Sequence, residues 1–245
     1  MGARWLALLV MPVACLDPVG PAFEPPSAQP EPSDSPVTIT TVGNYRYLVH
    51  WDAKPRPCPT ESLKTFPIDS LQARDGWYGG QLRAAGEGPL CSDASPAREL
   101  YRLAWIPSFH HTVIVRIERR EGEYSLTTVQ LSGAGGYEPG TPLRRSTIAI
   151  SQSEWNLWLG LVSRARFWQA QTIAADTVFD STGKHVEFMG LDGAQWMLEA
   201  TRANEYHAVD RWSPLKDGPY ARFREACSWL LRRSGLVPDT LMAEY

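Results

Sequence analysis

Apolar and polar positions alternate with a period of two in several short segments, a pattern typical of β-strands that bury one face. Residues 112–118 and 124–131 predict one hairpin, and residues 194–201 and 206–212 predict a second. Residues 145–150 predict a further strand between the two hairpins. The second half of the chain therefore favours an antiparallel sheet built from hairpins.

Two other segments carry apolar residues at helical spacing. The first follows Ser151, which forms a capping-box signature with Glu154. The last starts at Pro219, a residue type suited to the first helical position, and is expected to end at Gly235. The apolar stripes are Trp155, Trp158, Leu159, Val162 and Phe167 in the first, and Tyr220, Phe223, Cys227, Leu230 and Leu231 in the last. Hairpins alternating with helices predict an α+β domain whose two helices pack on one face of the sheet.

The short turn of the second hairpin defines a register for its strands. If Thr201 faces Tyr206, then Trp196 faces Arg211. A guanidinium beside an indole predicts a cation–π pair that contributes about 0.5–2 kcal/mol. Charged and aromatic residues are dense in this hairpin, and we expect it to be a packed core element rather than a site.

The amino-terminal residues have the pattern of an export signal. Arg4 precedes an apolar run over residues 5–11, too short for a bilayer core that needs about 20 residues. Cys15 after Ala14 resembles a bacterial lipobox, in which the cysteine is lipidated, although Pro12 stands where such signals usually have leucine. We expect export with a membrane anchor at Cys15; the alternatives are an ordinary secretory signal and a cytosolic protein.

Composition divides the chain into five expected segments. Residues 1–14 form the signal peptide, and the proline-rich residues 15–36 predict an extended tether. Residues 37–98 form a loop-rich subregion that begins with strands. Residues 99–236 form the α+β domain, and residues 237–245 form a C-terminal tail.

Four cysteines are present, and a lipidated Cys15 leaves three for an oxidising compartment. Cys58 and Cys91 both lie in the Pro/Gly-rich stretch 52–97, which looks irregular, so we expect a disulfide between them worth about 3–4 kcal/mol. Cys227 falls in the stripe of the last helix and is predicted to be a buried free thiol. The chain has no Cys-x-x-Cys motif, which leaves a zinc site without support.

Charge and motifs exclude further classes of protein. The net charge of −3 and a pI near 6.0, without a sustained Lys/Arg cluster, disfavour a nucleic-acid binder. The glycine-rich residues 133–136 lack the Gly-Lys-Ser/Thr of a P-loop and predict a hairpin loop instead. We therefore expect no cofactor and no metal.

A few side chains are candidates for chemistry or binding. His110 and His111 are adjacent, so on a strand they would point to opposite faces. His207 and Glu199 also fall on opposite faces in the register above, which argues against a direct pair. Structural roles are the expected ones, with an acid–base or metal-binding role as the alternative. Three tryptophans lie outside the predicted helices. Core packing is the expected role of each, and a glycan- or peptide-binding surface is the alternative: Trp51, Trp77 and Trp105.

Several motifs together resemble a group of uncharacterised bacterial proteins that often carry export signals. The resemblance covers roughly residues 99–236 and implies a bacterial source and a domain boundary, but no activity. The motifs are Tyr101-Arg102-Leu103-Ala104-Trp105, Phe109-His110-His111, Gly133-Ala134-Gly135-Gly136-Tyr137, Leu191-Asp192-Gly193-Ala194-Gln195-Trp196 and Tyr206-His207-Ala208-Val209-Asp210-Arg211-Trp212-Ser213-Pro214.

Taken together, these patterns predict a lipoprotein on the periplasmic or cell-surface side of a bacterial membrane. We expect it to bind a protein, peptide or glycan without catalysis. The alternative is an envelope hydrolase that uses His110, His111 or His207 as acid–base or metal-binding residues. Such an enzyme should place at least two of these histidines with a carboxylate in one pocket.

Overall fold

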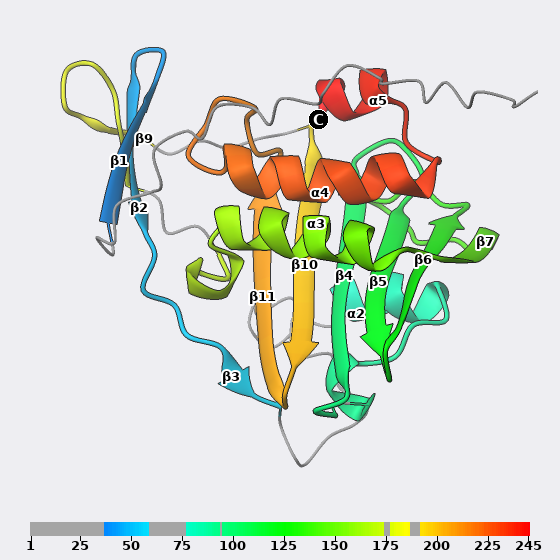
Figure 1. The fold of residues 1–245 in the computed structure, drawn as a ribbon. Coiled ribbons are helices and arrows are strands. Elements are labelled where there is room, and N and C mark those ends of the chain that lie inside the picture. Colours follow the sequence, from blue (N-terminus) through cyan, green and yellow to red (C-terminus); the bar gives the residue numbers. More distant parts are fainter. Residues whose placement is uncertain (1–36, 59–76, 94, 174–176, 187–191) are drawn as a thin grey trace, which may run out of the picture. The chain divides into compact units, whose positions relative to one another are not determined.

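Two antiparallel sheets form the framework of the protein in a computed structural model (Figure 1). The structure describes residues 37–58, 77–93, 95–173, 177–186 and 192–245. The larger sheet has the strand order β3-β11-β10-β4-β5-β6-β7, and the smaller sheet has the order β1-β2-β8-β9. The α+β class expected from the sequence is confirmed. The predicted signal peptide and tether lie outside the described residues.

The elements have the following bounds. The larger sheet contains β3 (Arg56–Pro57), β4 (Arg98–Pro107), β5 (Val113–Arg120), β6 (Glu123–Leu131), β7 (Pro142–Ala149), β10 (Ala194–Arg202) and β11 (Glu205–Trp212). The smaller sheet contains β1 (Val37–Val42), β2 (Tyr45–His50), β8 (Thr177–Phe179) and β9 (His185–Val186). The helices are α2 (Trp77–Ala84), α3 (Gln152–Arg164), α4 (Ala221–Ser234) and α5 (Asp239–Glu244), with short 3₁₀ helices η1 (Leu90–Asp93) and η2 (Phe167–Gln169).

Both predicted hairpins form, and the register of the second is the expected one. Thr201 pairs with Tyr206, and Trp196 pairs with Arg211. The sequence did not predict β4, which lies between β10 and β5 at the centre of the larger sheet. The reason is burial: β4 is covered on both faces along nearly its whole length, so apolar and polar residues do not alternate along it.

Helices cover both faces of the larger sheet (Figure 1). The helices α3 and α4 lie on one face, as expected, and their Trp158 and Leu230 belong to the same buried core as Leu103 of β4. On the other face α2 buries Tyr78 and Leu82 in a second core. The expectation that residues 52–97 are irregular is therefore wrong for α2. This helix contains two glycines and has little intrinsic propensity, so tertiary packing of its apolar face must stabilise it.

The predicted helix boundaries are close to the observed ones. A capping box at Ser151 and Glu154 starts α3. The helix α4 begins at Ala221, two residues after Pro219, and ends at Gly235, which adopts the left-handed conformation with a φ of 67°. No helix in the described part of the chain is both long and apolar enough to cross a membrane.

The cysteines behave as the sequence predicts. Cys58 and Cys91 form a disulfide with a Cα–Cα distance of 5.4 Å. Cys227 is a free thiol on the buried face of α4, and burial raises its pKa well above the usual value. A protonated, inaccessible thiol does not act as a nucleophile.

The cation–π pair expected between Trp196 and Arg211 does not form. The guanidinium of Arg211 lies 4.1 Å from the ring centroid of Tyr220, and Arg224 lies 5.1 Å from that of Trp196. The reason is that Arg211 turns to the backbone of the segment before β8, where it donates to the carbonyls of Gln171 and Thr172.

Trp196 is 0% exposed, whereas Trp212 on the paired strand is 41% exposed. We predict that Trp196→Ala lowers the free energy of unfolding by about 3–5 kcal/mol, because it removes a large aromatic side chain from the core. The matched control Trp212→Ala should cost less than about 1 kcal/mol. Urea melts of both variants measure the difference, and a wild-type melt for Trp196→Ala would show that the hairpin is not core.

Candidate functional site

The two adjacent histidines lie on the surface and have separate partners. His110 and His111 are exposed in the loop between β4 and β5. The Nδ1 atom of His110 is 2.8 Å from the Tyr245 hydroxyl, and that of His111 is 3.2 Å from the Gly133 carbonyl oxygen. Neither histidine contacts a carboxylate among the described residues, so the geometry offers this pair no acid–base partner.

His207 and Glu199 lie on opposite faces of the larger sheet, as the register predicts. His207 faces the α3 side, where its ring lies 5.1 Å from that of Phe167 and its Nε2 donates to the Ala170 carbonyl at 2.9 Å. Glu199 faces the α2 side and accepts from Arg102 at 2.6 Å. The two candidates therefore cannot act on the same substrate atom.

Glu199 belongs to a buried ion network on the α2 face. Arg102 lies between Glu199 and Glu87, with N–O distances of 2.6 and 3.3 Å, and its Nη1 also donates to the Gly88 carbonyl. The second oxygen of Glu199 accepts from the Tyr206 hydroxyl at 2.9 Å. Both oxygens of Glu199 are thus engaged, which makes its role structural rather than catalytic.

The three candidate tryptophans differ in exposure. Trp105 is 1% exposed and packs edge-on against Trp196, so it belongs to the core, as expected, and the alternative of a binding surface does not hold for it. The cause is the central position of β4, which directs Trp105 into the core under α3 and α4. Trp51 and Trp77 are half-buried and pack against the first and the second core, respectively.

An exposed aromatic pair lies at the end of the sheet where the β4–β5 and β6–β7 loops meet. Phe109 is 55% exposed, Tyr137 is 74% exposed, and their ring centroids are 6.1 Å apart. The glycine-rich loop packs closely here: the N–H of Gly136 donates to the Pro107 carbonyl at 3.0 Å. The predicted hairpin loop therefore forms, and backbone hydrogen bonds hold it. A side chain added at Gly136 would meet Ser108.

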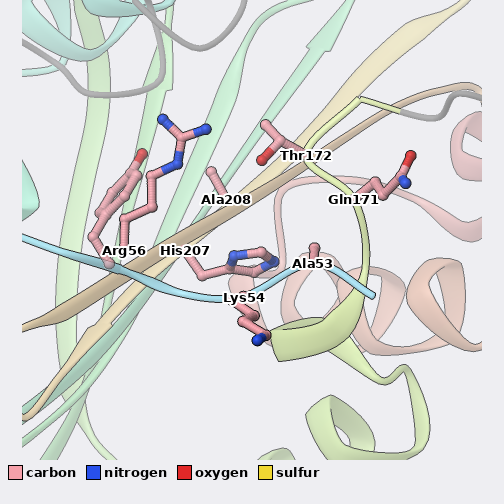
Figure 2. Close-up of a pocket in the computed structure, with 8 residues that line it drawn as sticks. Ala53, Lys54, Arg56, Gln171, Thr172, His207 and Ala208 are labelled. Carbon is pink, nitrogen blue, oxygen red and sulfur yellow. The ribbon is translucent and has the colours of Figure 1, made fainter. Parts of the chain in front are cut away.

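A pocket of about 270 Å³ lies at the outer edge of β11 (Figure 2). In Figure 2 the amine of Lys54 and the guanidinium of Arg56 lie on different sides of the His207 ring. The lining residues are Ala53, Lys54, Arg56, Gln171, Thr172, Tyr206, His207 and Ala208. They come from three segments that are far apart in the sequence: the chain before β3, the chain before β8, and β11 itself.

The pocket exists because, within the described segments, β11 is paired at only two points along its outer edge. At one end Tyr206 pairs with Arg56 of β3. At the other end Asp210 forms a parallel bridge with Ile173. Between these points the segment before β3 leaves the edge, because the N–H of Ala53 donates instead to the Gln169 carbonyl at 3.1 Å.

Positive charge dominates the pocket. Neither Lys54 nor Arg56 makes an ion pair with any residue that the structure describes. The carboxylate of Asp52 accepts from the Gln171 side chain at 3.2 Å and does not line the pocket. Arg211 does not line the pocket, but its guanidinium donates to the carbonyls of the lining residues Gln171 and Thr172.

His207 is neutral in this setting. Burial lowers its pKa from 6.5 to about 4; the Ala170 and Phe167 carbonyls partly oppose this, and Arg211 and Arg56 add to it. The ring is therefore uncharged near neutral pH and cannot repel a cation or pair with an anion there.

Sequence reasoning found His207 but missed Lys54, Arg56, Thr172 and Ala208 as residues of one pocket. A signal was present: in Lys54-Pro55-Arg56-Pro57 proline alternates with a basic residue. Proline in strands is confined to positions whose nitrogen faces away from the ladder, so this pattern is typical of an edge strand. The partner strand and the chain before β8 could not be inferred from it.

No group of three or more His, Cys, Asp or Glu residues within the described ranges is arranged to hold a metal ion. Comparisons with protein families, curated proteins and solved structures gave no match to the chain. The functional argument therefore depends on the residues of the pocket themselves.

The pKa of His207 predicts a pH dependence of stability. The unfolded chain takes up a proton near pH 6.5 and the folded chain only near pH 4, so protonation favours unfolding. This contribution is absent above pH 6.5 and should cost the fold about 3 kcal/mol as the pH falls to 4. His207→Gln keeps a side-chain donor for Ala170 and should remove that share of the decline.

Urea melts at pH 7 and pH 4 measure the effect, with His110→Gln as the exposed control. The control should lose stability as the wild type does. A decline of the same size in His207→Gln would mean that His207 is not the group responsible.

Proposed function

We propose that this protein is a lipid-anchored binding protein of the bacterial envelope that takes an anionic ligand in the pocket at the edge of β11. The observation that carries the proposal is that Lys54, Arg56 and a neutral His207 line the same pocket of about 270 Å³. Two cations without a carboxylate partner among the described residues attract an anion, and the walls around them are already formed.

Binding fits this pocket better than catalysis does. The alternative hydrolase needs a histidine that a carboxylate orients, or two histidines in one pocket. Among the described lining residues there is one histidine and no carboxylate, and the Nε2–H of His207 is committed to the Ala170 carbonyl. Such a side chain is suited to shaping a pocket and not to proton transfer.

The proposed anchor rests on the apolar run that ends at Ala14-Cys15 and on the proline-rich segment after it. A lipid at Cys15 would hold the domain at the membrane through a tether with the extended conformation of proline-rich chains. The disulfide between Cys58 and Cys91 supports an oxidising compartment.

We predict that Cys15→Ala releases the protein from the membrane fraction, because it removes the site of acylation. Fractionation of cells that express each form measures this, and intact mass of the wild type should show an acylated Cys15. Unchanged membrane retention of Cys15→Ala would contradict the anchor.

For the pocket, the probe is N-acetyl-L-alanine, a small carboxylate, compared with its uncharged methylamide. Titration followed by NMR should show binding of the acid and much weaker binding of the methylamide. Lys54→Gln with Arg56→Gln together should weaken binding of the acid about tenfold, since each exposed cation contributes up to about 1 kcal/mol.

The control is Lys216→Gln, which removes one positive charge from an exposed loop before α4. It should leave the affinity for N-acetyl-L-alanine unchanged. If the double pocket variant binds the acid as the wild type does, or if the acid and the methylamide bind equally, the pocket is not an anion site.

A further inference from the structure

The backbone of β11 inside the pocket adds a second recognition element to the cations. Along β11, residues with even numbers direct their N–H and C=O groups away from β10: the Asn204 carbonyl accepts from Cys58 at 2.9 Å, and the Asp210 N–H donates to Thr172 at 2.7 Å. Because the direction alternates along a strand, the N–H and C=O of Ala208 point the same way, into the pocket.

Within the described residues, these two groups of Ala208 have no partner on that side. Among the described residues, none accepts from the Ala208 N–H or donates to its carbonyl across the outer edge of β11. Ala208 is also buried. Buried backbone groups in proteins are nearly always paired, so the pocket favours an occupant that supplies both an acceptor and a donor.

We propose that this occupant is the carboxyl-terminal end of an extended peptide, which pairs with Ala208 as a short added strand while its carboxylate is attracted by the positive field of Lys54 and Arg56, which flank the pocket. This inference rests on the proposed function and names its ligand. A peptide backbone carries one N–H donor and one C=O acceptor per residue, which is the combination that Ala208 lacks.

The limits of the open edge explain why a chain end fits and a continuous strand does not. Tyr206 is paired with β3, and Asp210 is bridged to Ile173. The four residue steps between them span only about 13 Å. A peptide running through would collide with one of the two closures, whereas one or two terminal residues fit a volume of about 270 Å³.

The positive charge of the pocket determines which end of a peptide it can bind. Lys54 and Arg56 line the pocket, and both are free of ion pairs with described residues. Arg211 lies directly behind the Gln171–Thr172 backbone. The ammonium of an N-terminus would be repelled by this field, and a terminal carboxylate is attracted.

The test uses N-acetylated tetra-alanine in forms that differ by one group, titrated into the folded protein with its disulfide intact. The free acid should bind at least about tenfold more tightly than its C-terminal amide. N-methylation of one of the last two peptide nitrogens removes the donor for the Ala208 carbonyl and should weaken the free acid about tenfold, while methylation of the other should have little effect. Lys54→Gln with Arg56→Gln should remove the preference for the acid over the amide.

The outcomes separate this inference from the proposed function. Equal affinity of both N-methylated forms and the parent peptide would overturn strand pairing, although binding of N-acetyl-L-alanine would still support an anion site. Equal binding of an amidated peptide with an internal glutamate would overturn recognition of the chain end. If neither the peptides nor N-acetyl-L-alanine bind, both proposals fail.

Discussion

Partial pairing along the outer edge of β11 is the constraint on which the functional account depends. Exposed strand edges invite association with other chains, and proteins usually cover or interrupt them. Here β3 covers the edge at Tyr206, and the chain before β8 covers it at Asp210. The open stretch between them is too short for a continuous strand of another chain. It forms a pocket with the backbone groups of Ala208 inside and the cations Lys54 and Arg56 at its rim.

The interior of the protein holds the walls of this pocket in place from both faces of the sheet. On the α2 face, the Arg102–Glu199 pair fixes the hydroxyl of Tyr206, whose backbone closes the pocket at β3. On the other face, Arg211 holds the Thr172 carbonyl while its own side chain packs over Tyr220. A ligand would thus meet preformed groups, which lowers the entropic cost of binding.

Local patterns predicted part of this arrangement. The register of the β10–β11 hairpin and the capping box at Ser151 depend on residues that are close in sequence. The Cys58–Cys91 disulfide joins two cysteines of the same Pro/Gly-rich stretch. The strand β4 was missed because burial on both faces removes alternation, and α2 was missed because packing stabilises it against weak propensity. The pocket joins segments about 150 residues apart in sequence, and no local pattern carries that information.

The most direct test of the account is the backbone amide of Ala208 in an NMR titration with the N-acetylated tetra-alanine acid. The account predicts that this amide proton moves downfield and shows the largest change of any backbone amide, because it gains a hydrogen bond to the ligand. An unchanged Ala208 amide, with the shifts instead at the exposed aromatic pair Phe109 and Tyr137, would contradict the pocket as the binding site.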